Sequence, residues 1–273
     1  MTTESAPAAA GGSDDGRTVL RDLVFAEPVG FRPLSLDLHL APVGSPLIVF
    51  VHGGGWRIGS RRMFCPTMAD DDPFGRIVAA GFTVASVDYR LSAEANSPAQ
   101  QDDVAAALAW LAERAHEFGA DTSRIVLWGE SAGGTLAALV GLRPDAGVRG
   151  VIDWYGPSEL VAMGEQLGNV HGPASREAEW LGVPAGDDAA RARAASPALQ
   201  VHADAPPFHL AHGLADSAVP PEQSELLAGA LAAAGVPVEL ELVPGAGHMW
   251  QGEDVDRLGL LDRALAFARR VTS

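Results

Sequence analysis

The sequence has little cysteine and few basic residues, and each shortage excludes a class of protein. Among 273 residues there is one cysteine, Cys65, so no disulfide can form within the chain, which suits a reducing compartment. Lysine and arginine together number 19 against 35 aspartates and glutamates, giving a formal net charge of −16. Such an acidic protein repels nucleic-acid phosphates and anionic membrane surfaces, so we expect neither as a partner.

Long apolar runs and nucleotide-binding motifs are also missing. No stretch of about 18 consecutive apolar residues indicates a membrane span. The sequence contains no G-x-x-x-x-G-K-[ST], and Gly53 to Gly55 lack the spacing of a dinucleotide-binding loop. Residues 1–16 are small and polar, without the basic start and apolar stretch of a secretory signal. We therefore expect them to be a disordered tail, and the protein to be soluble and cytoplasmic.

The pattern of apolar residues predicts eight strands. Four leucines fall on one face of residues 33–40, and residues 18–25 alternate similarly, which is typical of half-buried antiparallel strands. Six later runs are apolar at almost every position, as expected of strands covered on both faces. The predicted strands cover residues 18–25, 33–40, 47–51, 82–87, 124–128, 148–154, 208–211 and 238–243.

Helical patterns separate the later strands. The predicted helices cover residues 98–118, a segment after Ser131, residues 220–234 and residues 255–271. The first ends before Gly119 and the third begins with Pro220 and ends at Gly235, which matches the preferences of helix ends. Strands that alternate with helices predict an α/β fold, with a mostly parallel sheet and helices on both faces. The length fits a single domain over residues 17–273.

One segment breaks this alternation. Residues 157–207 form a stretch of about 50 residues between two strands, with several prolines and short helical pieces. Connections of that length inside a compact domain are usually functional. We interpret the segment as a small cap inserted over the site; a structural excursion with no role in binding is the alternative.

A candidate nucleophile follows the predicted strand at residues 124–128. The stretch Gly129-Glu130-Ser131-Ala132-Gly133 has the form G-x-S-x-G between a strand and a helix. In that setting the serine sits on a sharp turn with its hydroxyl exposed, and the glycines let the strand and helix pass closely. We expect Glu130 to have a positional role in this turn, because a base is supplied elsewhere.

The base and the carboxylate that orients it are expected after later strands. Asp216 follows the strand at residues 208–211, and His248 follows the strand at residues 238–243 within a glycine-rich loop. The chain order Ser131, Asp216, His248 is the order expected of a catalytic triad in a fold of this kind. His212 is the nearest rival base, although its place at a strand end favours a structural hydrogen bond. Asp216 has an alternative role as the cap of the helix near Pro220.

A triple glycine follows the first fully apolar strand. In His52-Gly53-Gly54-Gly55-Trp56, the glycine backbone can turn its N–H groups into a cavity that side chains would obstruct. Such a loop can bind an oxyanion. Together with the serine motif, it predicts acyl-transfer chemistry.

These motifs resemble the α/β-hydrolase superfamily, and within it the hormone-sensitive-lipase-like and acetyl-xylan or feruloyl esterase-like carboxylesterases. The resemblance is carried by HGGGW at residues 52–56, VDYRLS at 87–92, GESAGG at 129–134, HGLAD at 212–216 and GAGH at 245–248. It implies an α/β-hydrolase fold and an oxyanion hole formed by the N–H groups of Gly54, Gly55 and Ala132. Glu130 replaces the aspartate common in the lipase-like branch, which favours the smaller esterases.

The expected activity is hydrolysis of short-chain acyl esters through an acyl-enzyme, with a small-molecule ester as substrate and no metal or organic cofactor. An amidase or formamidase, such as a kynurenine formamidase, would use the same triad and is the alternative. A non-catalytic ligand-binding relative is a third hypothesis, against which His248 counts, because such relatives lose this histidine. The side chains expected to line a substrate pocket, with plain core as the alternative for several, are Trp56, Trp154, Tyr155, Trp180, Met249 and Trp250.

Overall fold

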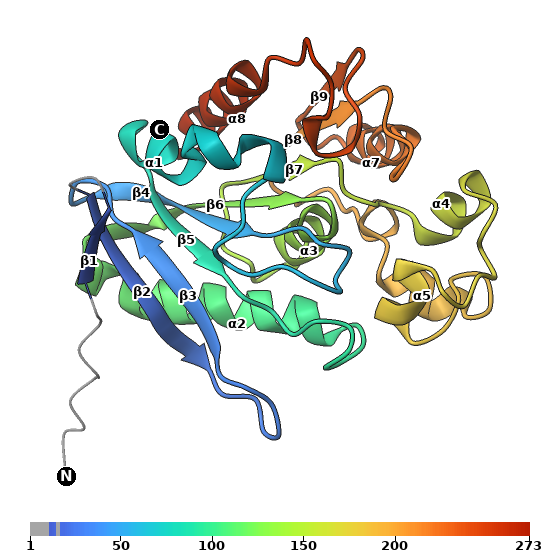
Figure 1. Ribbon diagram of the computed structural model, residues 1–273, viewed down its shortest axis with the longest axis horizontal. Coiled ribbons are helices and arrows are strands. Elements are labelled where there is room, and N and C mark those ends of the chain that lie inside the picture. The colour runs from blue at the N-terminus through green and yellow to red at the C-terminus, as the bar shows by residue number, and fades with distance from the viewer. Residues whose placement is uncertain (1–10, 15–16) are drawn as a thin grey trace.

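The computed structural model describes residues 11–14 and 17–273, and its centre is one twisted sheet (Figure 1). The sheet has nine strands in the order β1-β2-β3-β5-β4-β6-β7-β8-β9. The strands are β1 (Gly11–Asp14), β2 (Arg17–Ala26), β3 (Leu34–His39), β4 (Ser45–Val51), β5 (Thr83–Val87), β6 (Ala120–Glu130), β7 (Gly150–Trp154), β8 (Phe208–Gly213) and β9 (Val238–Val243). All eight predicted strands are present, as β2 to β9.

Strands β1, β2 and β3 are antiparallel, and β3 also pairs antiparallel with β5. From β5 to β9 every pairing is parallel, which confirms the predicted mostly parallel sheet. Strand β1 was not predicted, since its sequence Gly-Gly-Ser-Asp has no strand-forming residue. It lies within the expected tail, residues 1–16, and the expectation of disorder is wrong for these four residues; residues 1–10 and 15–16 lie outside the described residues.

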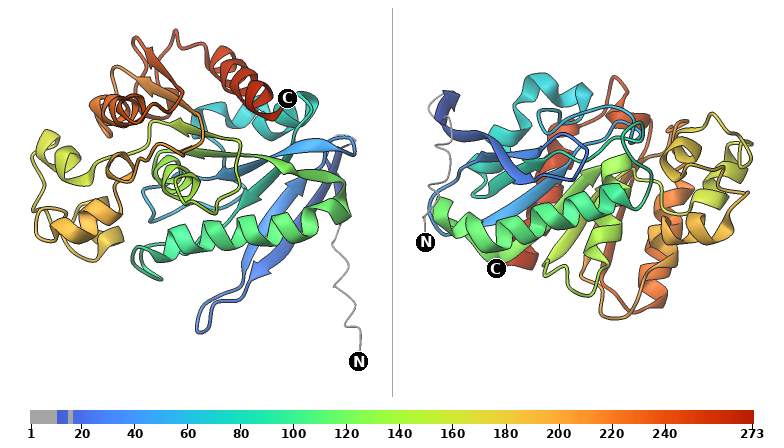
Figure 2. Two further views of the ribbon diagram at one scale, coloured as in Figure 1. Left: turned by 180° about the vertical axis from the view of Figure 1, so that it is seen from behind. Right: turned by 90° about the horizontal axis from the view of Figure 1, so that it is seen from below.

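Helices cover both faces of the sheet, as predicted. Helices α2, α3 and α7 pack on one face, and α1 and α8 pack on the other (Figures 1 and 2). The helices are η1 (Pro66–Asp71), α1 (Pro73–Ala79), α2 (Ala99–Arg114), η2 (Ala115–Phe118), α3 (Ala132–Gly141), α4 (Leu160–Gln166), α5 (Arg176–Leu181), α6 (Ala189–Ala194), η3 (Pro197–Leu199), α7 (Glu222–Ala233), η4 (His248–Trp250) and α8 (Arg257–Thr272). None of the helices in the described part of the chain is long and apolar enough to cross a membrane.

The two faces explain why the central strands are apolar throughout. In β4, Leu47, Val49 and Val51 join the hydrophobic cluster beneath α2 and α3. Ile48 and Phe50 point the other way and join the cluster beneath α8. A strand buried on both faces cannot alternate between polar and apolar residues, so it reads as one continuous hydrophobic run.

The segment at residues 157–207 connects β7 to β8 through α4, α5, α6 and η3. Helices α4 and α5 lie at one end of the molecule, beyond α3 (Figure 1). The segment also contacts the loop after β4, because Arg57 Nη2 donates to the carbonyl oxygen of Ala174 over 3.0 Å and pairs with Glu179.

Candidate active site

Ser131 sits on a strained turn between β6 and α3. Its φ of 52° lies in the left-handed region, which is unfavourable for a residue with a Cβ. The turn is held by two backbone bonds: Ser131 N–H donates to the Trp154 carbonyl over 2.8 Å, and Thr135 N–H donates to the Ser131 carbonyl over 3.1 Å. Strain of this kind persists only where the surrounding structure fixes it, and it is frequent at active sites.

The glycine after this serine permits the close approach of strand and helix. A Cβ on Gly133 would lie 2.5 Å from the His52 carbonyl oxygen and still closer to that of Val51. Both atoms belong to the backbone of β4 and the loop that follows it, so neither can move aside cheaply. The helix α3 therefore touches the strand that precedes the triple glycine.

Three side chains predicted as a triad lie within hydrogen-bonding reach of one another. Ser131 Oγ is 3.0 Å from His248 Nε2, and His248 Nδ1 is 2.6 Å from Asp216 Oδ2. The residues come from the ends of three different elements, β6, β8 and β9, at the carboxyl edge of the parallel sheet. Ligand sites of open α/β sheets occur at this edge. Ser131 keeps 9% of its surface exposed.

Asp216 uses its two carboxylate oxygens for different partners. Oδ1 accepts from the backbone N–H groups of Ala218 and Val219, over 2.8 and 2.9 Å, and Oδ2 faces His248. Burial of the carboxyl opposes ionisation, but hydrogen bonds from His212, His248 and Val219 N–H hold the pKa of Asp216 below its usual value. The contact with His248 is present, but Asp216 does not cap helix α7, whose N-cap is Pro221 without a side-chain hydrogen bond; its Oδ1 binds the preceding loop at Ala218 and Val219 instead.

His212, the rival base, is fully buried and bonded on both ring nitrogens. Nδ1 lies 2.7 Å from Ser224 Oγ, and Nε2 lies 2.9 Å from the Val219 carbonyl and 3.3 Å from Asp216 Oδ2. The carbonyl only accepts, so the proton is on Nε2. His212 thus supports the loop that carries Asp216 and does not approach Ser131.

His248 is carried by a loop with unusual backbone geometry. The next two residues, Met249 and Trp250, have φ of 58° and 59°. The Met249 carbonyl accepts from Thr67 Oγ1 and Cys65 Sγ, which tie this loop to the segment before α1. Trp250 is fully buried beneath α8, and this burial offsets the strain.

The triple-glycine loop turns back on itself directly after β4. Gly54 and Gly55 have φ of 117° and 60°, which only glycine adopts readily, and the Gly54 carbonyl accepts from the N–H groups of Arg57 and Ile58. Within the described residues the N–H groups of Gly54 and Gly55 have no hydrogen-bond partner. Ala132 is the first residue of α3, so its N–H has no partner inside the helix.

His52 fixes the start of this loop. Its Nδ1 lies 2.7 Å from the Gly53 carbonyl, and its ring stacks on Tyr89 at a centroid distance of 4.3 Å. Burial lowers the pKa of His52 to about 4, so the ring is neutral and Nδ1 donates. Tyr89 in turn donates to the His52 carbonyl over 3.1 Å. The motifs HGGGW and VDYRLS therefore meet as one packed unit.

The aromatic residues expected to line a pocket belong to the core. None of Trp56, Trp154, Tyr155, Trp180 and Trp250 exposes more than 1% of its surface. They pack in the two clusters on either face of the sheet, because large apolar side chains gain most from complete burial. Their burial favours the alternative of plain core for these five, and Met249 is partly exposed.

Sequence reasoning missed the residues that support the loops. Cys65, Thr67 and Arg61 hold backbone positions next to the site, but they lie between predicted elements and belong to no motif. Arg61 N–H donates to Asp88 Oδ1 over 2.8 Å, and its guanidinium pairs with Asp37 and Asp88. Only their position in the loop after HGGGW gave any indication of this role.

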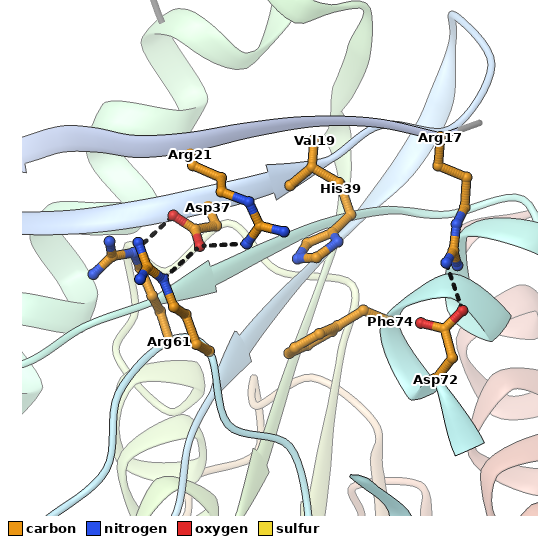
Figure 3. Close-up of a pocket in the computed structure, with 9 residues that line it drawn as sticks. Arg17, Val19, Arg21, Asp37, His39, Arg61, Asp72 and Phe74 are labelled. Atoms are coloured by element: carbon orange, nitrogen blue, oxygen red, sulfur yellow. Dashed lines mark hydrogen bonds and ion pairs between the residues drawn. The ribbon is translucent and has the colours of Figure 1, made fainter. Parts of the chain in front are cut away.

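These arginine pairs form part of a separate pocket of about 190 Å³ near β2 and β3 (Figure 3). Arg17, Arg21, Asp37 and Arg61 line it, and each arginine is paired with an aspartate. No triad residue lines this pocket. In the part of the chain that the structure describes, no group of three or more histidine, cysteine or acidic residues is placed to hold a metal ion.

Known esterases are similar to this chain in sequence. Esterase LipQ from Mycobacterium tuberculosis is 32% identical over 220 residues, which are 75% of this chain and 50% of LipQ. Esterase LipC from the same organism is 30% identical over 247 residues, which are 81% of this chain and 57% of LipC. The chain thus spans about half the length of the curated relatives that it matches.

Solved structures match over almost the whole chain. The propionate-bound structure of an esterase from the Planctomycetes species Thermogutta terrifontis has a TM-score of 0.74 and 26% identity, with 97% of this chain and 95% of that chain covered. A truncated carbohydrate esterase from gut microbiota has a TM-score of 0.82 at 24% identity, over 96% and 99% of the two chains. The latter match concerns the fold alone. The BD-FAE family model matches residues 36–231, most of the sheet and the serine turn included. The chain has the α/β-hydrolase fold and belongs to the BD-FAE family, which confirms the resemblance to carboxylesterases of this superfamily.

Proposed function

We propose that this protein is a serine carboxylesterase that hydrolyses short-chain acyl esters through an acyl-enzyme. The observation that carries the proposal is the chain of contacts from Ser131 Oγ through His248 to Asp216. It lies beside the triple-glycine loop, where the N–H groups of Gly54 and Gly55 have no partner among the residues that the structure describes. Serine is a poor nucleophile until a positioned base removes its proton, and this arrangement supplies that base. The esterases among the relatives and solved structures support the same reaction class.

The reaction has two steps. His248 Nε2 accepts the proton of Ser131 Oγ as the oxygen attacks the ester carbonyl, and Asp216 holds the imidazolium through Nδ1–H. The N–H groups of Gly54, Gly55 and Ala132 donate to the oxyanion of the tetrahedral intermediate. When the intermediate collapses, the alcohol leaves with the proton from His248. Water then repeats the sequence on the acyl-enzyme, which releases the acid and restores Ser131.

The preference for short acyl chains is supported by the cap and by the packing of the aromatic residues. We propose that the segment at residues 157–207 is a small cap, and its contact with Arg57 places α5 against the triple-glycine loop. Because the five aromatics expected to line a pocket are core residues, they leave no broad apolar wall for a long chain. The Thermogutta esterase that shares 26% identity binds propionate in its structure.

A cytoplasmic location stays a prediction.

The test uses the wild type and Ser131→Ala on a ladder of p-nitrophenyl esters from acetate to decanoate. We expect the highest kcat/KM on the shortest esters and roughly a million-fold lower turnover in the variant. Paraoxon, which phosphorylates the Thermogutta esterase, should transfer one diethylphosphoryl group to the peptide containing Ser131, as seen by mass spectrometry. Full activity of Ser131→Ala would overturn the proposal. A formamide substrate hydrolysed faster than every ester would instead favour the amidase.

A further inference from the structure

Directly beside Ser131 lies a buried carboxylate that the proposed mechanism does not use. Glu130 is the last residue of β6, and only 3% of its surface is exposed. Within the described residues it forms no ion pair with an arginine. Buried carboxylates without a cation are costly, so one retained next to a nucleophile needs an explanation.

Three donors surround this carboxylate. Tyr155 Oη donates to Glu130 Oε2 over 2.8 Å, and the Gly53 N–H and the Cys65 thiol lie near enough to the carboxylate to favour its ionised form. The Gly53 N–H can only donate, whereas the Tyr155 hydroxyl and the Cys65 thiol can also accept, so the Gly53 N–H favours a carboxylate oxygen without a hydrogen. The surroundings therefore fit the ionised form of Glu130.

The same contacts link the carboxylate to the working parts of the site. Gly53 begins the triple-glycine loop, and a Cβ placed on it would lie 3.5 Å from Glu130 Cγ, so the carboxylate side chain packs at the start of this loop. The ring of Tyr155 packs against the His248 imidazole, with centroids 5.0 Å apart at 65°. Cys65 also bonds to the Met249 carbonyl, directly after His248. Glu130 thus lies against the triple-glycine loop and reaches the His248 loop through Tyr155.

We propose that Glu130 is a positioning residue. Its negative charge keeps the triple-glycine loop and Tyr155 aligned with Ser131, and it stabilises the imidazolium that His248 forms during acyl transfer. This inference rests on the proposed function. The titratable groups around the carboxylate are Tyr155, Cys65 and Tyr89, with His248 and His212 beyond the Tyr155 ring. Only the two histidines can become cations, and His212 is held by Ser224 and Val219.

The electrostatics give the inference a pH signature. Burial raises the pKa of Glu130 to about 7, against the opposing hydrogen bonds from Tyr155, Gly53 and Cys65. Below that pH the carboxyl gains a proton and loses its charge, so it no longer offers a negatively charged acceptor to the Gly53 N–H. Activity should therefore fall as the pH drops through 7, in addition to the loss caused by protonation of the catalytic base.

The experiment compares kcat, KM and the pH profile of kcat/KM for the wild type, Glu130→Gln and Tyr155→Phe. Asp153→Asn is the matched control. Asp153 is also a buried carboxyl, and burial raises its pKa to about 7, but it accepts from the Gly156 N–H and does not contact the site. We expect kcat of Glu130→Gln to fall about 10- to 100-fold at pH 8, with KM within about threefold of the wild-type value. The free energy of a hydrogen bond to a charged group corresponds to a rate factor of this size. The acid limb of its profile should move to lower pH. Tyr155→Phe should show a smaller loss of kcat, and the control should match the wild type.

A Glu130→Gln enzyme with wild-type kcat and an unshifted acid limb would overturn the inference. If that variant does not fold by circular dichroism, Tyr155→Phe decides, and an unchanged kcat in this variant counts against the inference. Paraoxon labelling of Ser131 in the wild type separates the two proposals. Stoichiometric labelling with no effect of Glu130→Gln removes only the role of Glu130, whereas absence of labelling removes the proposed function.

Discussion

Trp56 and Trp180 stack almost face to face, with ring centroids 4.2 Å apart and planes 5° apart. Trp56 ends the triple-glycine motif, and Trp180 belongs to α5 in the segment at residues 157–207. Trp180 Nε1 also donates to Gln100 Oε1 over 3.0 Å, which ties α5 to α2. One indole thus joins the proposed cap to both the site loop and the main domain.

Removal of this stack should affect stability and turnover together. We expect Trp180→Ala to lower the free energy of unfolding by about 4 kcal/mol, the usual cost of deleting a buried tryptophan, and kcat by about tenfold as the loop loosens. Urea unfolding and kcat on p-nitrophenyl acetate measure both. Trp110→Ala, on the half-buried outer face of α2, is the control and should leave kcat unchanged. Equal kcat in wild type and Trp180→Ala would contradict the coupling.

Asp216→Asn should abolish most activity without unfolding the protein. Two backbone N–H groups bind Oδ1, so the amide oxygen of asparagine must take that place and its NH₂ must face His248. The imidazole would then accept at Nδ1 and carry its proton on Nε2, where it cannot receive one from Ser131. We expect kcat to fall roughly 10⁴-fold. Asp145→Asn, an exposed carboxylate, is the control; a loss below tenfold in Asp216→Asn would refute this tautomer argument.

Two glycine-to-alanine substitutions should change the free energy of unfolding in opposite directions. Gly133→Ala places a Cβ against the backbone of β4, so we expect a loss of at least about 3 kcal/mol in unfolding free energy or an insoluble protein. Gly229 lies within α7, where a Cβ would meet no neighbouring side chain or packed element within 4 Å, and Gly229→Ala should stabilise by about 0.5–1 kcal/mol. Thermal melting of both variants checks this, and a stable Gly133→Ala protein would disprove the close approach.

Asp153 should make the folded protein less stable as the pH rises. Burial raises its pKa to about 7, whereas an unfolded aspartate titrates near 3.9, so between these values the folded state keeps a proton that the unfolded state has lost. Stability therefore decreases with pH across this window. In Asp153→Asn the decrease between pH 5 and 7 should be shallower by about 1 kcal/mol per pH unit. Urea unfolding at several pH values measures the slope; an unchanged slope would show that Asp153 is ionised when folded.

Arg61 should matter for stability more than its neighbour Arg62. Its guanidinium bonds to Asp37, whose side chain is 1% exposed (Figure 3), and also to Asp88. Burial opposes ionisation of Asp37, but the bonds from Arg61 and Asp22 N–H lower its pKa. Arg61→Met leaves these carboxylates without their main cation, which should cost about 3 kcal/mol at pH 7.

The Arg61 effect has an acid dependence that a packing defect would not show. A lowered pKa means that the ion pair stabilises the protein above the unfolded value near 3.9 and that this contribution is lost as the pH falls through the folded value. The difference between wild type and Arg61→Met should therefore be smaller at pH 3 than at pH 7. The exposed Arg62 in Arg62→Ala should cost less than about 1 kcal/mol.

The strands and the triad positions were predictable because their signals are local. A strand covered on both faces must be apolar at each position, and a side chain at the end of such a strand lies at a known edge of the sheet. That rule, together with the G-x-S-x-G motif and the glycine-rich loop before His248, pointed to Ser131, Asp216 and His248. Helix α1 was not predicted, since its seven residues include a proline and a glycine and are too few for a periodic pattern.

The supporting contacts were not predictable, because they join residues far apart in the chain. Nothing in the sequence around Arg61 indicates that Asp37 and Asp88 lie beside it. For the same reason, composition cannot distinguish a tryptophan that lines a pocket from one in the core. Trp154 and Trp250 are both fully buried, and their edge-to-face contact, with centroids 5.3 Å apart, joins β7 to the loop of His248.

The strained backbone at Met249 and Trp250 has a consequence for evolution and engineering of this chain. His248, which carries the proton in the proposed reaction, is held in place by the buried indole of Trp250. This indole packs among the aromatic side chains beneath α8 and is not part of the sheet. Substitutions in that distant layer can therefore tilt the imidazole and change the reaction rate while every group that meets the ester stays the same. Variation in catalytic efficiency among close homologues is to be sought there as well as around the nucleophile.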